Sequence, residues 1–514
     1  MVRNTKHTWM ITTGLAAAGL LATSTLTQAQ SPVASVAPEN ARPNAPIQTV
    51  MQSPLPDDFD ADRDEWREGI ESLAKHGLQP APYLNRFDSI AQFEPQTIAP
   101  FLHALVSDLR YGTQHGELSL EQHQLVTEEV NALIDECDEP EECLQTIAAR
   151  HPDYAPLQAM LTHFKQLAAI DAWPVLESGE TLKPGMTGPR VAQLRTLLQV
   201  SGDLKKPLFG LNKEEDNRYT AQLEDAVKSY QARHGLAVDG AVGPNTLRSM
   251  QIGPAERAEQ IALTLERMRS VDIPETGIAI NVPDYHLQAF RDGREVLQMP
   301  VIVGATDTAT PLFFNKINRI VVNPTWTPPM SIVGNELIPK LQNNPGYAYN
   351  SNFSVYDRSS GVELNPDSVD WYAVSANDVK LVQNAGNGNA LGKVKFLMPD
   401  NRAIYLHDTS SPKLFSKEYR ALSHGCVRVQ DPQALMDYVL ADQRDDLNTA
   451  QSAWQDGGDP KAFRLHQEVP VQMTYFTARV NTAGEITFHD DVYGSDAELK
   501  TAMAAKLPVM ASAE

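Results

Sequence analysis

The residues best suited to chemistry lie in the segment 423–428, which reads Ser-His-Gly-Cys-Val-Arg. A second histidine, His407, ends an apolar run upstream of it. A thiol beside a tight glycine turn, with imidazole available from two directions, provides the groups for covalent acyl transfer. That reaction needs a thiolate that attacks a carbonyl, donors for the developing oxyanion and an acid for the leaving group. Cys426 is therefore the candidate nucleophile, and His407 is the candidate proton acceptor and donor.

Three neighbours of Cys426 are candidates for supporting roles. Gly425 permits a close backbone approach, so the amides of Gly425 and Cys426 are candidate oxyanion donors. His424 could polarise the site or orient its loop. Ser423 either shapes the turn or forms a hydrogen bond at the cysteine, and the sequence leaves both interpretations open.

Two elements must bring these groups together. Alternation in the segment 402–407 predicts a strand with Tyr405 and His407 on the same face. Tyr405 would then face the site, although strand tyrosines are usually packing residues. After the cysteine, Asp431 and Pro432 can cap and begin a helix. The strand and the segment before the helix could present imidazole and thiol to each other.

The N-terminal 29 residues have the layout of a secretory signal peptide. Arg3 and Lys6 precede an apolar stretch from Met10 to about Leu26, and small residues follow at the usual cleavage spacing. The apolar stretch is short and weakly hydrophobic for a membrane anchor. We therefore expect the chain to be exported. The net charge of -22 argues against nucleic-acid binding, which needs clustered Lys and Arg.

Export makes the three cysteines informative. Cys137 and Cys143 could close a short disulfide loop in an oxidising compartment. Their segment offers too few ligands for a metal site, and no phosphate-cradling loop is visible, so we expect no metal and no other cofactor. This disulfide would leave Cys426 unpaired, which makes Cys426 a candidate reactive thiol.

The chain is long enough for about three domains, and its patterns predict a multidomain α+β protein. Composition and periodicity change several times along the sequence. The expected segments are a signal peptide over 1–29, a disordered linker over 30–59, a helical scaffold over 60–175, a three-helix unit over 180–252, a β-rich domain over 273–495 and a C-terminal tail over 496–514.

The three-helix unit has two amphipathic stretches, one beginning at Pro189 and one centred on Leu223 to Tyr230, with a stop at Gly235. A turn and a short third helix follow. This pattern resembles the peptidoglycan-binding domain found on many cell-wall enzymes. The alternative is a helical spacer that binds nothing.

The β-rich domain contains several runs with a period of two residues. Strands are expected over 277–283, 287–291, 296–303, 319–322, 393–398 and 403–406. A long insertion over about 326–389 interrupts them and opens with Ser331 as a possible cap on a helix through Leu341. So long an excursion is more often a functional lid than an idle loop.

His407, followed by Ser423-His424-Gly425-Cys426-x-Arg428, resembles the signature of the L,D-transpeptidase catalytic domain of the YkuD type. Supporting matches lie at 389–396, around Trp326 and in the late segment 475–494, which suggests a closing C-terminal hairpin. The whole order resembles the large periplasmic L,D-transpeptidases of Gram-negative bacteria. Several relatives carry Asn shortly after the Arg, where this chain has Val-Gln-Asp at 429–431.

The resemblance implies that Cys426 attacks the bond between diaminopimelate and the terminal D-Ala of a peptidoglycan stem tetrapeptide. The acyl group then passes to the side-chain amine of a second stem, giving a 3-3 cross-link. Tyr405, Trp326 and Arg428 are candidate substrate-binding residues, and Arg428 either binds a stem carboxylate or forms a structural ion pair. The thiolate should also be acylated by carbapenems.

The same acyl-enzyme could react with a different acceptor. Water would give carboxypeptidase activity, a free D-amino acid would give exchange, and a lysine would attach a protein to the wall. A protein of another class, a wall-bound scaffold with a silent catalytic domain, is a further alternative. The presence of both His407 and Cys426 counts against it.

Overall fold

The computed structural model describes residues 63–91, 94–148, 151–170, 173–205, 217–399, 402–481 and 483–511. The predicted signal peptide (1–29) and linker (30–59) lie outside the described residues. Among the described ones, no helix has the length and apolar character needed to cross a membrane. The fold is multidomain α+β, with separate hydrophobic cores for its helical and β-rich parts.

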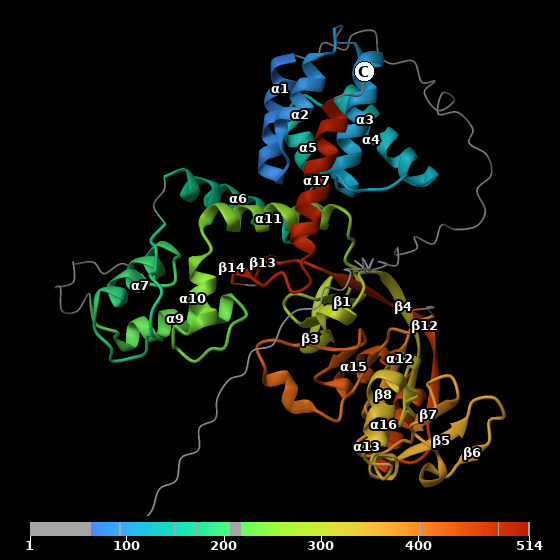
Figure 1. Ribbon diagram of the computed structural model, residues 1–514. Helices are drawn as coiled ribbons and strands as arrows, with labels where there is room; N and C mark the ends of the chain where they lie inside the picture. Colours follow the sequence, from blue (N-terminus) through green and yellow to red (C-terminus); the bar gives the residue numbers. More distant parts are fainter. Residues whose placement is uncertain are drawn as a thin grey trace, which may run out of the picture. The chain divides into compact units, whose positions relative to one another are not determined.

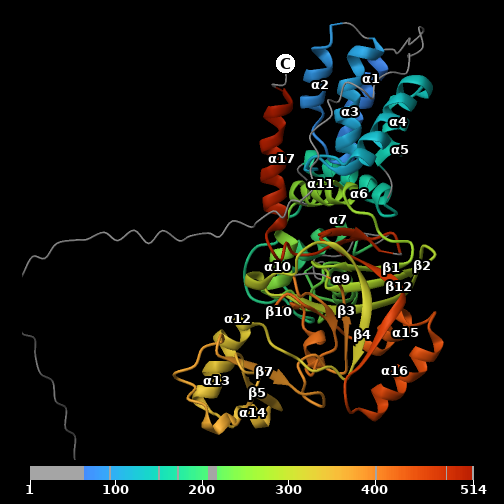
Figure 2. The same ribbon diagram turned by 90° about the vertical axis from the view of Figure 1, so that its right-hand side faces the viewer.

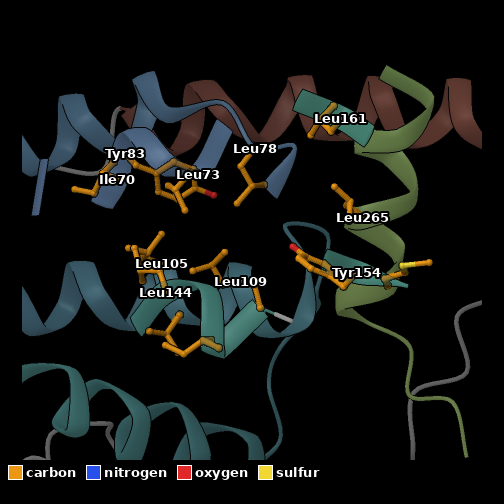
Figure 3. Packing of buried hydrophobic residues seen from close by; sticks show 14 of the residues in the cluster. Ile70, Leu73, Leu78, Tyr83, Leu105, Leu109, Leu144, Tyr154, Leu161 and Leu265 are labelled. Carbon is orange, nitrogen blue, oxygen red and sulfur yellow. The ribbon is translucent and has the colours of Figure 1, made fainter. Parts of the chain in front are cut away.

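The first hydrophobic core is helical, and it includes elements from both ends of the described chain (Figure 1). Buried leucines, isoleucines and aromatic side chains from several helices meet there (Figure 3). The capping box of Ser119 and Gln122, for example, fixes the start of α4. The helices of this part are α1 (Arg63–Glu71), η2 (Ser72–His76), α2 (Pro80–Asp88), α3 (Pro95–Tyr111), α4 (Leu120–Glu136), α5 (Pro140–Ala148), α6 (Tyr154–Ala169), α11 (Pro254–Arg269) and α17 (Ser495–Ala511).

Cys137, directly after α4, and Cys143, in α5, form a disulfide with a Cα–Cα distance of 6.3 Å. The bond joins the end of one helix to the start of the next. Cys426 is the free cysteine of the described residues.

Two late segments differ from the sequence expectation. The hairpin of β13 (Ala478–Val480) and β14 (Ile486–Phe488) exists, but it is a sheet of its own and not the closing part of the large sheet. Ile486 and Phe488 alternate onto one face and are buried in the helical core. The expected tail, 496–514, is helical as far as Ala511, and this helix, α17, packs against α2 and α11.

The three-helix unit has its own core around Leu194, Leu197, Leu223 and Tyr230. Its helices are α7 (Pro189–Val200), α9 (Ala221–Arg233) and α10 (Pro244–Gln251). The first begins at Pro189, as predicted, because the fixed φ of proline suits the first helical position. Gly235, at φ +62°, follows α9.

The third core fills a mixed sheet whose order is β10-β3-β11-β9-β8-β4-β12-β1-β2. A further pairing of β3 with β2 closes the sheet into a ring. The helices α15 (Pro432–Val439) and α16 (Arg444–Asp456) add side chains to this core. The strands are β1 (Gly277–Asn281), β2 (His286–Arg291), β3 (Arg294–Gly304), β4 (Phe314–Val322), β8 (Val394–Leu397), β9 (Leu406–His407), β10 (Ala421–Ser423), β11 (Val427–Val429) and β12 (Lys461–Thr474).

Alternation along the strands separates an inner face from an outer face. Phe396, Leu406 and Val427 are fully buried in the ring core. Their neighbours in sequence therefore point outward. The outer face of β8, β9 and β11 is where the candidate catalytic residues lie.

The insertion folds as a unit with its own core and a three-stranded sheet of order β6-β5-β7 (Figure 2). Its first helix begins at Met330 with Pro329 as the preceding cap residue, so the expectation that Ser331 caps it is wrong. The insertion contains α12 (Met330–Ile332), the π-helical turn η4 (Val333–Leu337), α13 (Ile338–Asn343), α14 (Tyr347–Asn350), β5 (Phe353–Asp357), β6 (Glu363–Leu364), η5 (Pro366–Ser368) and β7 (Val379–Gln383). Two short turns, η3 (Thr306–Thr308) and η6 (Pro412–Ser416), lie outside it.

Candidate active site

Strand pairing places the thiol and the imidazole on one face. β11 runs parallel to β9, with Arg428 opposite His407. The Val427 amide donates to the Tyr405 carbonyl at 3.2 Å, which continues the pairing by one step. Because side chains alternate, Cys426 and Arg428 project from the same outer face as Tyr405 and His407.

The strand that holds His407 is shorter than the sequence predicts. β9 comprises Leu406 and His407 only, and Ala403 has a left-handed φ of +55°. A residue at positive φ cannot continue an extended strand, so the predicted strand over 403–406 is wrong except at its end. The bend brings the Ala403 carbonyl to 3.7 Å from Cys426 Sγ, which donates to it.

His407 is a buried neutral base. Its side chain is 5% exposed, and burial, reinforced by the charge of Arg428, lowers its pKa to about 3. Its Nδ1 lies 2.5 Å from the Asp408 carbonyl oxygen. A carbonyl only accepts, so Nδ1 carries the proton and Nε2 keeps a lone pair. The imidazole is thus held in the tautomer that can accept a proton at Nε2.

The Cys426 side chain is half-buried, and burial raises the pKa of its thiol. Hydrogen bonds at Tyr405 and the charge of Arg428 act in the opposite direction. The resting pair is therefore a neutral thiol and a neutral imidazole, and not a thiolate–imidazolium pair. Deprotonation of the thiol then accompanies its attack.

Tyr405 and Trp326 form a short chain of contacts that leads to the thiol. The Tyr405 hydroxyl forms hydrogen bonds with the side chains of Trp326 and Cys426, and burial raises the pKa of the phenol. The Trp326 backbone pairs with Gln383 in β7, at 2.9 and 2.7 Å. Tyr405 is therefore at the site, and Trp326 connects the site to the insertion.

The loop before the cysteine is closed by Ser423. Its buried hydroxyl donates to the Cys426 carbonyl at 2.5 Å and accepts from the Gly425 amide at 3.2 Å. The Gly425 amide is thus engaged inside the loop, and in this state it does not serve the predicted oxyanion role. The Cys426 amide donates to no group in the described part of the chain, so its N–H is open to a ligand and it stays a candidate oxyanion donor.

Gly425 meets a steric requirement. Its φ of +102° is unfavourable for residues with a Cβ, and an added Cβ would lie 3.1 Å from Ile404 Cδ1. The glycine turn inferred from the sequence is present.

The residues that brace this loop were not predicted. The Thr310 hydroxyl donates to the Gly425 carbonyl at 2.8 Å, and Thr308 Oγ1 donates to the Ser423 carbonyl at 3.0 Å. The Tyr493 hydroxyl donates to the Gly304 carbonyl at 2.7 Å and accepts from the Thr310 amide at 3.1 Å. These contacts join segments far apart in the chain, and no local pattern signals them.

His424 points away from the thiol and toward the insertion. Its Nε2 lies 2.6 Å from Glu336 Oε1 in η4, and the ring is exposed. Lys340 Nζ lies 3.6 Å from the same Glu336 carboxylate. The contact ties the catalytic loop to the insertion.

Two cations lie beside His407. Arg428 is on one neighbouring strand and Lys395 on the other, each directly opposite the histidine. Lys395 Nζ donates to the Thr325 carbonyl at 3.3 Å and lies 6.0 Å from the Tyr405 ring centroid. The sequence includes Lys395 in a supporting match but assigns it no role, because strand register is not visible there.

A cavity of about 280 Å³ adjoins the site at the base of the insertion. Trp326 lines it together with aromatic and amide side chains, among them Tyr347, Phe353, Asn352 and Gln383. In the part of the chain that the structure describes, no group of three or more His, Cys, Asp or Glu side chains is placed to hold a metal ion.

Two segments match known domain families. Residues 275–471, which contain the thiol and the imidazole, match the L,D-transpeptidase catalytic domain. Residues 187–250 match the putative peptidoglycan binding domain. Each segment is therefore similar to the domain that its motifs predict.

A curated relative supports this assignment. A putative L,D-transpeptidase of Haemophilus influenzae is 34% identical over 247 residues, which cover 48% of this chain and 49% of the relative. The chain thus spans about half the length of the curated relative it matches.

Solved structures of two L,D-transpeptidases are also similar. One, from Xylanimonas cellulosilytica, is 17% identical, covers 58% of this chain and 98% of its own, and has a TM-score of 0.17. L,D-transpeptidase 1 of Mycobacterium tuberculosis is 12% identical, covers 38% and 60%, and has a TM-score of 0.15.

Proposed function

We propose that this protein is an L,D-transpeptidase that uses Cys426 to form 3-3 cross-links between diaminopimelate residues of peptidoglycan stems. The observation that carries the proposal is the placement of Cys426 directly before β11, the strand beside that of His407, with the imidazole held as an Nε2 base. The peptidoglycan-binding domain supports the substrate class.

The chemistry follows from the roles of these groups. His407 Nε2 takes the thiol proton as sulfur attacks the carbonyl of the donor peptide bond, and the Cys426 amide stabilises the oxyanion. The imidazolium then returns the proton to the leaving amine as the C–N bond breaks, which leaves a thioester. An amine of a second stem attacks the thioester and gives a proton to His407, which passes it to the departing sulfur as the C–S bond breaks. One peptide bond is broken, one is formed, and the enzyme is restored.

The setting of the reaction is part of the proposal. The signal peptide over residues 1–29 would deliver the chain to the periplasm, where peptidoglycan stems are present. The insertion, attached to the site through Trp326 and Glu336, would act as a lid that excludes water from the thioester. Exclusion of water favours transfer to an amine over hydrolysis.

The test is incubation with a purified disaccharide tetrapeptide, followed by mass spectrometry of the muropeptides. Transpeptidation predicts a cross-linked dimer and released D-Ala, both absent with Cys426→Ala. Loss of D-Ala without a dimer would instead indicate the carboxypeptidase alternative. No change with the wild-type protein would favour the silent scaffold and contradict the proposal.

A carbapenem provides a second probe of the same thiol, because its strained carbonyl resembles an activated acyl donor. We expect a covalent adduct on Cys426 that is absent in Cys426→Ala. An adduct on another residue would contradict the assignment of the nucleophile.

A further inference from the structure

Three neighbouring strands place a row of nitrogen-bearing side chains beside the thiol. Register pairs Lys395 of β8 with His407 of β9, and His407 with Arg428 of β11. All three side chains project from the outer face of the ring. His407 therefore lies between two cations, one on each side.

Neither cation is neutralised by a carboxylate within the described residues. The Arg428 side chain forms no hydrogen bond or ion pair there, and its Nε is buried without a partner. Lys395 Nζ has one carbonyl acceptor, that of Thr325. A buried donor without an acceptor is costly, and such a group is usually matched by a ligand or an acid.

The acidic side chains near the site are committed elsewhere. The Asp408 carboxylate accepts from the backbone amides of Lys393 and Thr409, at 2.7 and 2.6 Å. Glu336 is paired with His424 and Lys340. The row thus keeps two positive charges that no acid of the site offsets.

We infer that Lys395 and Arg428 form a receptor for the free α-carboxylate of the residue that leaves the donor stem. This inference rests on the proposed function. His407 must give its proton to the leaving amine, and in a C-terminal residue the carboxylate lies one carbon atom from that amine. Cations on both sides of His407 would therefore lie where they can bind that carboxylate while His407 protonates the amine. The receptor confines cleavage to the last residue of a stem.

A competing explanation is that the two cations only stabilise the thiolate. Thiolate stabilisation changes the rate with every electrophile by the same factor, whereas a carboxylate receptor favours anionic reagents. The ratio of two alkylation rates therefore separates the two roles. Iodoacetate and iodoacetamide have the same reaction, in which the C–S bond forms, the C–I bond breaks and iodide leaves.

The experiment measures alkylation of Cys426 by both reagents at pH 8 in the full chain, relative to a free cysteine derivative. We expect the wild-type ratio of iodoacetate to iodoacetamide to exceed the free-thiol ratio about tenfold, and to fall several-fold in Lys395→Met. Lys393→Met is the matched control, because the Lys393 ammonium lies over the Trp454 ring and away from the row. Its ratio should remain that of the wild type.

A wild-type ratio equal to that of the free thiol would overturn the inference, and this measurement needs no variant. So would an equal loss of both rates in Lys395→Met. A parallel assay compares a tetrapeptide donor that ends in a carboxylate with the same donor ending in an amide. If the alkylation ratio is high but neither donor is turned over, the proposed function is contradicted and the carboxylate receptor is supported. If both donors are turned over equally, the carboxylate receptor is contradicted and the proposed function is supported.

Discussion

At the scale of single residues, the Tyr405 side chain is one of the groups that lower the pKa of the thiol. Its hydroxyl forms a hydrogen bond with Cys426 that favours the thiolate. Tyr405→Phe should therefore raise the thiol pKa further and slow alkylation by iodoacetamide at pH 8 about three- to tenfold. The rate measured against pH checks this, with the exposed Tyr419→Phe as control. A pH profile identical to that of the wild type would contradict the role of the hydroxyl.

The sequence was a good guide to residue types and a poor guide to their partners. Cys426 and His407 could be found because thiol, imidazole and glycine turn stand in one recognisable pattern. The hydrogen bond from the Gly425 amide to the Ser423 hydroxyl could not be predicted, because it depends on the closure of the loop. The charged row beside His407 depends on strand register, which one sequence does not reveal.

At the scale of elements, the loop after β3 holds the catalytic loop in place. Thr310 is 2% exposed and donates to the Gly425 carbonyl while it accepts from the Gly304 amide. Thr310→Val leaves both groups without this partner, so we expect a loss of about 2 kcal/mol in the free energy of unfolding. Denaturant unfolding checks it, with the exposed Thr306→Val as control. Equal stability of the two variants would show that the brace is dispensable.

The contact between His424 and Glu336 is an element-scale link between the insertion and the catalytic loop. Glu336→Gln removes its charge, so residues 330–343 should exchange amide hydrogen faster than in the wild type. Hydrogen exchange read by mass spectrometry measures this. Glu363→Gln, in β6 of the same insertion, is the matched control. Unchanged exchange over 330–343 would mean that other contacts hold the insertion.

Element prediction succeeded where the pattern was local. Pro189 began the helix expected of it, and strands β1 to β3 lie where the two-residue period placed them. The strand before His407 failed because Ala403 takes a left-handed φ that its sequence does not signal. The sequence predicts the hairpin, but its packing on the helical core depends on tertiary contacts that the local pattern does not show.

At the scale of the whole molecule, buried histidines link stability to pH. His76, His234 and His407 are each buried, and burial is the main cause that lowers the pKa of each. The pKa falls to about 3 for His76 and His407. Below the ordinary histidine pKa of about 6.5 the unfolded chain binds protons that the native protein does not. Stability is therefore highest above that pH and decreases as the pH falls toward 3.

Each such histidine contributes about 1.4 kcal/mol per pH unit within this window. We expect the melting temperature to drop steadily from pH 7 to pH 5, and to drop less steeply in His76→Gln. Scanning calorimetry at constant ionic strength measures both. A melting temperature that does not change between pH 7 and pH 5 would contradict the burial of neutral imidazoles.

The organisation of the whole chain was readable only in outline. The peptidoglycan-binding unit and the catalytic domain carry motifs, and both match known families. The helical core has no motif, and α11, α17 and the β13–β14 hairpin join it from segments that the sequence assigns to other parts or to no domain. Such long-range packing depends on which apolar faces meet in the folded protein. The local sequence pattern does not show this.

The central claim is that Cys426 carries the acyl group, with His407 as its proton carrier. The most direct measurement is rapid quenching of the enzyme with excess disaccharide tetrapeptide, followed by mass mapping of the acylated peptide. We predict a thioester on Cys426 that forms at least about a hundredfold more slowly in His407→Ala. An acyl group on any other residue, or the same rate of acylation without His407, would contradict the account.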